Sequence, residues 1–228
     1  MTKATSKTSR PAGFFITGTD TDVGKTYVSG CIAHTLIESG VTVIPRKPIA
    51  SGCIKQSDGS LLSEDALFLQ QACQSPDSLD KICPNQFEPP ISPQTAIEQA
   101  GLFISTQDLI EVCQPPKQAK EKEVYLVEGA GGFYSPLCSD GLNEDLAKAL
   151  ELPVILVVKN ELGCINHTLL TLNAIKQAGL KTLCIVLNFT GDTNFANGLE
   201  NWTGLPIFTL PESPTQQTTV IPGFIDLI

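Results

Sequence analysis

Residues 18–26 read GTDTDVGKT, a combination of glycine, lysine and threonine that binds nucleotide phosphates. The segment follows the apolar run 14–16 and precedes a stretch with helical spacing, which predicts a strand, a tight loop and a helix. Backbone N–H groups of such a loop and the start of its helix hold an anion. Lys25 would reach the β- and γ-phosphates, and the Thr26 hydroxyl would ligate Mg²⁺.

One position of this loop departs from the usual phosphate-binding pattern. The pattern G-x-x-x-x-G-K-[ST] places its first glycine where this chain has Thr19, and the nearest glycine is Gly18. The alternative is a chance Gly-Lys-Thr in an ordinary strand-to-helix turn. The surrounding strand, loop and helix favour the phosphate site.

A second candidate is Glu128, which ends the apolar run 124–127 and precedes Gly129-Ala130-Gly131-Gly132. Ligands of open parallel sheets bind at the carboxyl ends of the strands. A carboxylate there would hold Mg²⁺ directly or through water, and the glycines let phosphate or substrate approach the backbone. An acid that merely meets solvent is the alternative, and the phosphate loop in the same sheet favours the metal.

Other polar residues at element ends stay ambiguous from the residues alone. Lys47 ends a predicted strand, but lysine is usually solvated, and Arg46 beside it is expected to be solvated too. Asp65 lies in the first turn of a predicted helix, where an acid often only complements the helix dipole. Asn188 either presents its amide to a base or ends its strand in a turn.

These residues need a scaffold in which strand ends meet, and the chain predicts one. Short Val/Ile/Leu runs alternate with helical stretches, which indicates a doubly wound, mostly parallel α/β fold in a single domain, residues 13–228. Ser63 is placed to cap one helix, and Gly179 follows another. The predicted strands are 14–17, 41–47, 124–128, 154–158, 182–188 and 206–210; the predicted helices are 25–38, 64–73, 144–150 and 165–177.

Four segments show no such periodicity. Residues 74–93 are rich in Pro, Ser and Asp and predict a long loop, and residues 114–123 predict a charged surface connection. Residues 211–222 form a tail with little pattern. Residues 1–12 are expected to be a short disordered tail, a fragment of an organelle-targeting segment being the alternative.

Composition excludes several classes of function. The net charge of −9 disfavours a polyanion, so no nucleic-acid partner is expected, and no apolar run reaches membrane-spanning length. The eight scattered cysteines form no C-x-x-C pair and read as core residues kept reduced in the cytoplasm. Only His34 and His167 would complete a zinc site, so zinc is not expected. The cysteines are Cys31, Cys53, Cys73, Cys83, Cys113, Cys138, Cys164 and Cys184.

Several segments together resemble the dethiobiotin synthetase family of P-loop NTPases. The resemblance runs in the family's order over most of residues 14–210. It implies ATP- and Mg²⁺-dependent closure of a cyclic urea from diaminopelargonic acid and CO₂ in biotin synthesis. Compared with the usual pattern, this loop has one additional residue between Gly18 and Gly24, and that additional residue is also a feature of the family. The matching segments are GTDTDVGKT, RKPIASG (46–52), EDAL (64–67), VEGAGGFYSPL (127–137), LPVILVV (152–158) and LGCINH (162–167).

The resemblance implies a role for each matching residue. Lys47 matches the lysine regarded as catalytic and Lys25 the P-loop lysine, while Asp65 and Glu128 match two acids around the metal that Thr26 ligates. The stretch 211–213 diverges from the family, so its match is loose. The implied nucleotide-binding residues are Asp22, Val23, Gly24, Lys25, Thr26, Tyr27, Asp65, Glu128, Gly129, Ala130, Gly131, Asn188, Pro211, Glu212 and Ser213.

Contacts to the base and the substrate are implied in the same way. Ser51 matches a substrate contact, and Asn188 matches an amide that recognises the base. Phe189 follows Asn188 where other members have Asp, which leaves base selectivity open. Asp22 replaces the Glu of some members, a change expected to be neutral.

The implied chemistry gives the two lysines a purpose. An amine of the substrate captures CO₂ as a carbamate, and Lys25 and Lys47 supply cationic partners for this anion. A carbamate oxygen attacks the γ-phosphate, and the second amine then closes the ring and expels phosphate. No protein nucleophile is required, so His34 and His167 are expected to be structural or peripheral.

The segment LGCINH joins a predicted strand to a helix, and free N–H groups at a helix start form an anion site. From the residues alone, a plain N-terminal turn capped by Asn166 is favoured. The resemblance instead implies that the substrate's far carboxylate is bound across a homodimer interface. The implied substrate-binding residues there are Gly163, Cys164, Ile165 and Asn166.

The sequence disfavours three alternative functions. A ParA/MinD-like regulatory ATPase typically carries an additional lysine early in its P-loop, and residues 18–22 contain none. An amidoligase usually brings a glutaminase domain, for which this chain has no length. A pseudoenzyme or binding module would not need Lys25, Thr26, Lys47, Asp65 and Glu128 together.

Overall fold

The computed structural model describes residues 12–115, 122–191, 193–213, 215 and 217–228. The predicted tail 1–12 therefore lies outside the described residues except for Ala12, and so does most of the predicted connection 114–123.

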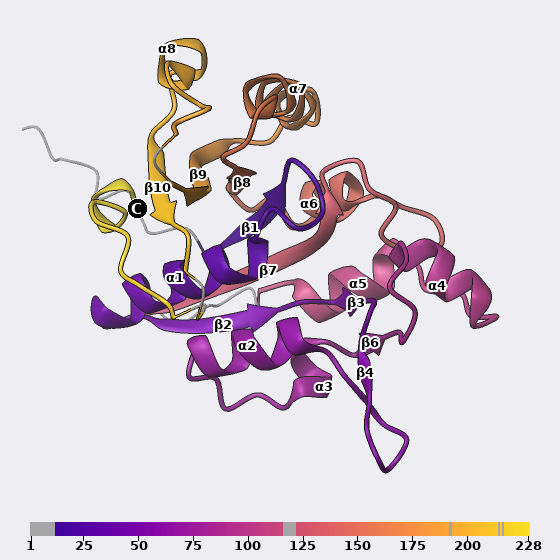
Figure 1. The fold of residues 1–228 in the computed structure, drawn as a ribbon. Helices are drawn as coiled ribbons and strands as arrows, with labels where there is room; N and C mark the ends of the chain where they lie inside the picture. The colour runs from indigo at the N-terminus through magenta and orange to yellow at the C-terminus, as the bar shows by residue number, and fades with distance from the viewer. Residues whose placement is uncertain (1–11, 116–121, 192, 214, 216) are drawn as a thin grey trace, which may run out of the picture.

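A parallel sheet forms the centre of the molecule (Figure 1). Its six strands lie in the order β10-β9-β8-β1-β7-β2, and every neighbouring pair is parallel. All six predicted strands are present. The strands are β1 (Gly13–Gly18), β2 (Thr42–Arg46), β7 (Glu123–Gly132), β8 (Val154–Lys159), β9 (Thr182–Thr190) and β10 (Ile207–Pro211).

Helices cover both faces of the sheet. The four predicted helices are present as α1 (Lys25–Glu38), α2 (Glu64–Ala72), α6 (Asn143–Leu150) and α7 (Cys164–Gln177). Ser63 caps α2, since its hydroxyl accepts a hydrogen bond from the Ala66 N–H, and Gly179 has the left-handed φ of +77° after α7. The other helices are α3 (Leu79–Ile82), α4 (Pro93–Gln99), α5 (Thr106–Cys113), α8 (Leu199–Thr203) and the 3₁₀ turn η1 (Ile225–Leu227).

The prediction of one long loop over residues 74–93 was wrong. This segment contains α3 and the short strand β6 (Asn85–Gln86), which pairs with β3 (Ile49–Ala50). Tertiary contacts stabilise these short elements: Ile82 is fully buried, and its carbonyl accepts a hydrogen bond from the Lys47 N–H. A hairpin of β4 (Ile54–Lys55) and β5 (Leu61–Leu62) precedes them.

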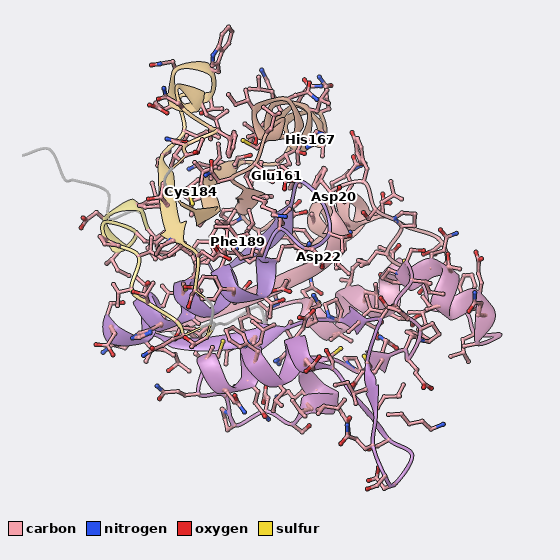
Figure 2. All side chains as sticks on the ribbon, in the orientation of Figure 1. Asp20, Asp22, Glu161, His167, Cys184 and Phe189 are labelled. Atoms are coloured by element: carbon pink, nitrogen blue, oxygen red, sulfur yellow. The ribbon has the colours of Figure 1, made fainter. Side chains whose placement is uncertain are left out.

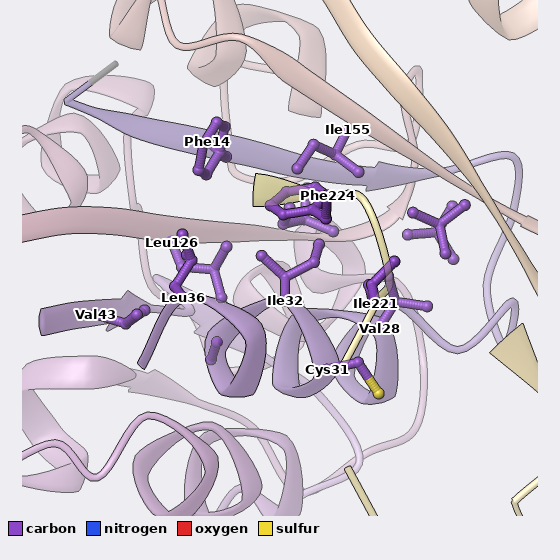
Figure 3. Packing of buried hydrophobic residues seen from close by; sticks show 14 of the residues in the cluster. Phe14, Val28, Cys31, Ile32, Leu36, Val43, Leu126, Ile155, Ile221 and Phe224 are labelled. Carbon is purple, nitrogen blue, oxygen red and sulfur yellow. The ribbon is translucent and has the colours of Figure 1, made fainter. Parts of the chain in front are cut away.

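The core on the α1 face joins distant parts of the chain (Figure 3). Residues of α1, such as Ile32 and Leu36, pack against β1, β7 and β2, and Phe224 near the C-terminal end lies among them. The Phe224 ring meets those of Phe14 and Phe208 edge-on, with centroid distances of 6.1 and 5.7 Å. This favourable aromatic geometry adds to the burial of α1 on the sheet.

Helices α5, α6 and α7 contribute to the core on the opposite face, where Phe15 and Val127 point. All eight cysteines are buried and free, as predicted. Within the described residues, no helix is both long and apolar enough to cross a membrane.

Candidate active site

The phosphate loop ends in a glycine that the geometry requires. Gly24 has φ +86° at the start of α1, and a Cβ added to it would overlap the amide nitrogen of Asn188. No side chain caps the start of α1, so its first N–H groups remain available to an anion. The Lys25 ammonium donates to the Asp20 carbonyl at 3.0 Å and thereby lies over the loop.

Lys47 sits between two carboxylates. Its Nζ lies 2.7 Å from Oε1 of Glu128 and 3.0 Å from Oδ2 of Asp65. Strands β2 and β7 are neighbours, with Arg46 opposite Val127, so Lys47 and Glu128 follow matched positions at the ends of two strands. Lys47 and Glu128 are both buried, which excludes the solvated lysine and the solvated acid that the sequence left open.

Glu128 is held by hydroxyl groups of α1 as well. Thr26 Oγ1 donates to its Oε1 and Ser29 Oγ donates to its Oε2, both at 2.7 Å. Ser29 is fully buried and was missed by the sequence analysis. Its signal was available: Ser29 follows Thr26 by one helical turn, so both hydroxyls share a face of α1. Together with Lys47 they give each carboxylate oxygen a donor.

The charges in this cluster shift one another's pKa values. Burial, and then the nearby charge of Lys47, lowers the pKa of Lys25 to about 8. Burial alone would lower the pKa of Lys47 as well, but the Asp65 and Glu128 carboxylates raise it well above its usual value. The Lys47 ammonium in turn lowers the pKa of Asp65. Both lysines are therefore mainly charged at neutral pH, and Lys25 is the one that would lose its proton first as the pH rises.

Lys25, Lys47 and Asp65 line an open cavity of about 580 Å³ at the carboxyl ends of the strands. Figure 2 labels Asp22 and Phe189 near the start of α1, and both belong to its wall. The cavity brings together most of the predicted site. Among the predicted residues it is lined by Asp22, Gly24, Lys25, Thr26, Tyr27, Lys47, Ser51, Asp65, Ala130, Gly131 and Ser213.

Other predicted residues do not line this cavity in the described structure. Glu128 and Asn188 lie buried beneath it, and Asn188 donates from Nδ2 to the Val23 carbonyl at 3.1 Å. Cys164 lines a smaller cavity of about 90 Å³ on the other side of the loop. Val23 also lines the smaller cavity, and besides Glu128 and Asn188 the predicted residues that line neither cavity are Gly129, Pro211, Glu212, Gly163, Ile165 and Asn166.

The expectation that Arg46 is solvated was wrong. Its guanidinium is buried, donates to Asp77 at 2.8 Å and to the Val112 carbonyl at 3.1 Å, and lies over the Tyr125 ring. Lys47 and Arg46 are adjacent in sequence, so their side chains leave the backbone in different directions. Arg46 fixes the end of β2, from which Lys47 reaches the site.

Parallel sheet and phosphate loop together define a P-loop NTPase. A family model described as an AAA domain matches residues 12–216. Solved structures show the same fold. The MinC:MinD complex of Aquifex aeolicus aligns with a TM-score of 0.54 and 13% identity, covering 94% of this chain and 84% of that chain. A ParA family ATPase from Chlorobium tepidum aligns with a TM-score of 0.51 and 13% identity, covering 89% and 86%.

Proteins with similar sequences define the family more narrowly than the fold does. Proteins named ATP-dependent dethiobiotin synthetase BioD match at 39% identity in Ruthia magnifica, over 77% of this chain and 79% of that protein. The protein of the same name from Aeromonas salmonicida matches at 39% identity, over 84% of this chain and 85% of that protein. The one from Rhodopirellula baltica matches at 33% identity, over 92% of this chain and 88% of that protein. The chain belongs to the ATP-dependent dethiobiotin synthetase family.

Proposed function

We propose that this protein forms dethiobiotin by ATP-dependent closure of a cyclic urea from diaminopelargonic acid and CO₂, a step of biotin biosynthesis. The observation that carries this proposal is the buried Lys47 between Asp65 and Glu128, in the same cavity as Lys25. A plain phosphate loop would bind a nucleotide without this second cation. The names of the relatives supply ATP and the product, dethiobiotin, and the family resemblance implies diaminopelargonic acid and CO₂ as the other substrates.

The two lysines suit an anionic reaction centre. The carbamate formed from an amine and CO₂ carries negative charge, and its attack on the γ-phosphate spreads further charge over the transferred group. Lys25 comes from the phosphate loop and Lys47 from the end of β2, so they face this charge from two elements. Because both are fixed before substrate binds, they stabilise the transition state without reorganisation. Ser51 lines the same cavity and is the proposed substrate contact.

Thr26, Asp65 and Glu128 would hold Mg²⁺. The test of fit is the donor set: a hydroxyl and two carboxylates gather around one point, where Lys47 Nζ contacts both acids. Hard oxygen donors of this kind suit Mg²⁺. When bound, the ion would neutralise charge on the β- and γ-phosphates. A nucleotide-bound structure in which Asp65 points away from the metal would remove it from the set.

We also propose a homodimer in which the start of α7 meets the partner's substrate. Leu162 and Leu170 of this region are 87% and 62% exposed, an apolar surface suited to a second copy of the chain. Gly163, Cys164, Ile165 and Asn166 would then present N–H groups to the far carboxylate of the diamine. Sedimentation equilibrium tests this arrangement, and a fully active monomer would refute it while leaving the ATP site untouched.

The decisive experiment supplies purified protein with MgATP, bicarbonate and diaminopelargonic acid and detects dethiobiotin by mass. Lys25→Ala should abolish most product, whereas the matched change Lys55→Ala, on the exposed strand β4, should not. ATP hydrolysis that proceeds equally without the diamine, with no dethiobiotin formed, would favour a ParA/MinD-like ATPase. The eight buried thiols support a reducing, cytoplasmic location, and residues 13–228 are proposed to act as one domain.

A further inference from the structure

A fully buried asparagine at the start of α6 holds the glycine-rich end of β7. Oδ1 of Asn143 accepts a hydrogen bond from the Ala130 N–H at 3.1 Å, and Nδ2 donates to the Ala130 and Gly132 carbonyls at 2.6 and 3.0 Å. The same Nδ2 also donates to the Ser135 carbonyl at 3.3 Å. One side chain thereby fixes backbone groups on both sides of Gly131, which has a left-handed φ of +75°.

This role requires a short side chain that donates and accepts hydrogen bonds at once. The amide of asparagine does both, and buried backbone groups that lack such partners are costly. The approach is close: a Cβ added to Gly129 would overlap Oδ1 of Asn143, so a glycine is needed there. The Asn143 N–H also donates to the Ser135 carbonyl at 3.1 Å. The end of β7 and the start of α6 are therefore joined through both side chain and backbone.

The segment that Asn143 holds belongs to the candidate active site. Ala130 and Gly131 line the cavity of about 580 Å³. The Gly129 carbonyl accepts a hydrogen bond from Nζ of Lys47 at 3.3 Å, besides the two carboxylates that this ammonium contacts. The Gly129 carbonyl and the Ala130 N–H are the two ends of one planar peptide unit, so they cannot turn independently. Asn143 and Lys47 thus hold opposite ends of the same peptide.

We propose that Asn143 is a positioning residue for Lys47 and acts through the peptide between Gly129 and Ala130. With this peptide fixed, the ammonium has three acceptors in set places, and its geometry is determined before substrate binds. Without the asparagine, the peptide loses the partner of its N–H and turns, so the Gly129 carbonyl leaves the ammonium. A merely structural role would confine the effect to the stability of α6. The inference deepens the proposed function and rests on it for the reaction that Lys47 serves.

The first experiment measures dethiobiotin formation by Asn143→Ala. We expect kcat about tenfold below that of the wild-type protein, since a small misplacement of a reacting group is costly in rate. Thr35→Val is the matched control: this buried threonine of α1 lines neither cavity described above, and its Oγ1 accepts from the Ile221 N–H at 2.9 Å. It loses a comparable buried hydrogen bond, so its melting temperature should fall while kcat stays unchanged. Normal kcat in folded Asn143→Ala would overturn the proposal.

A double variant tests whether the effect passes through Lys47. When Lys47→Ala is already present, adding Asn143→Ala should change kcat by less than about twofold, because residues that act as a unit are not additive. Tenfold losses in both backgrounds would show that Asn143 acts by another route and would refute the proposal. Asn143→Ser repeats both measurements if the alanine variant unfolds. Its hydroxyl is able to accept from the Ala130 N–H, so a loss of about threefold is expected with Lys47 present and none without it.

Chemical labelling separates this inference from the proposed function. An amine-reactive succinimidyl ester, with mass spectrometry to locate the label, reports how firmly Lys47 is held without nucleotide or diamine. The Lys47 side chain is 4% exposed, so it should react slowly in the wild-type protein and about tenfold faster in Asn143→Ala. Exposed Lys55 is the internal reference and Thr35→Val the control, both with unchanged rates. Unchanged labelling of Lys47 would refute the inference while dethiobiotin is still formed; faster labelling in a protein that forms no dethiobiotin would refute only the proposed function.

Discussion

Nζ of Lys47 lies 2.7 Å from Oε1 of Glu128, and both side chains are buried. The two residues come from neighbouring parallel strands, so the sheet itself sets their separation. Glu128 keeps two hydroxyl donors besides this ammonium, and Lys47 has a second carboxylate partner in Asp65. The pair is therefore fixed from several elements before any substrate arrives, as electrostatic preorganisation requires.

Replacing Lys47 by alanine should lower turnover about a hundredfold. The loss of one preorganised partner of developing charge typically costs roughly 3 kcal/mol of transition-state stabilisation. Steady-state kinetics with MgATP and the diamine measures the effect, and Lys55→Ala, an exposed lysine on β4, is the control. Circular dichroism shows whether the variant is folded. Near-normal turnover of folded Lys47→Ala would exclude its catalytic role.

Ser29→Ala should weaken the positioning of Glu128. The change removes the donor to Oε2 of a buried carboxylate, so we expect about 2 kcal/mol lower stability and roughly tenfold lower turnover. A purely structural role would leave the Mg²⁺ concentration needed for half-maximal activity unchanged, whereas misplacement of Glu128 raises it. Ser39→Ala, at the exposed end of the same helix, provides the comparison. An unchanged Mg²⁺ requirement in Ser29→Ala would contradict the positioning role.

Gly24→Ala should destabilise the protein by about 3 kcal/mol. The methyl group meets the Asn188 amide, and the residue keeps a positive φ that alanine avoids. Gly59→Ala separates these causes: Gly59 has φ +88° but no atom within 4 Å of an added Cβ. Its cost should be about 1 kcal/mol, from the backbone conformation alone. Denaturant titration measures both, and equal costs would show that the contact with Asn188 is unimportant.

Asp77→Asn should lower stability by about 2 kcal/mol at neutral pH, because Arg46 keeps its buried position and loses its carboxylate partner. Burial alone would raise the pKa of Asp77, but hydrogen bonds from Lys81 and Arg46 lower it below its usual value of 3.8. The carboxylate therefore stabilises the fold above about pH 4 and loses this effect as pH falls through its lowered pKa. Unfolding measured from pH 7 to pH 3 should show the two proteins converging in acid. Asp80→Asn, at an exposed acid of α3, is the control variant.

The sequence predicted the sheet well because buried parallel strands are near-continuous Val/Ile/Leu runs, and here these short runs alternate with helical stretches. It missed α4 and α5, whose start signals are local and not periodic. Ser92 caps α4 with Pro93 in its first turn, and Ser105 forms a capping box with Asp108 in α5. A search for helix-capping residues, in addition to apolar periodicity, would have predicted both helices.

Within the candidate site, the sequence indicated the location of those residues that lie at the ends of parallel strands. Lys47 and Glu128 meet because parallel neighbours end at one edge. Burial of Arg46 was unpredictable from its neighbours, since its partner Asp77 is distant in sequence and lies in a segment predicted as a loop. Asn188 shows the same limit: its bond to the Val23 carbonyl joins two residues that only the folded sheet brings together.

The edge-on packing of Phe224 against Phe14 has a consequence for how the protein is made. The helix that carries Lys25 rests on a core built from β1 and from the distant segment around Phe224. During synthesis, the apolar faces of α1 and β1 remain exposed until the later strands have been translated. Prolonged exposure of apolar surface favours binding by chaperones or aggregation. The core beneath the nucleotide site is thus completed only after Phe224 has been translated, although the phosphate loop precedes most strands of the sheet.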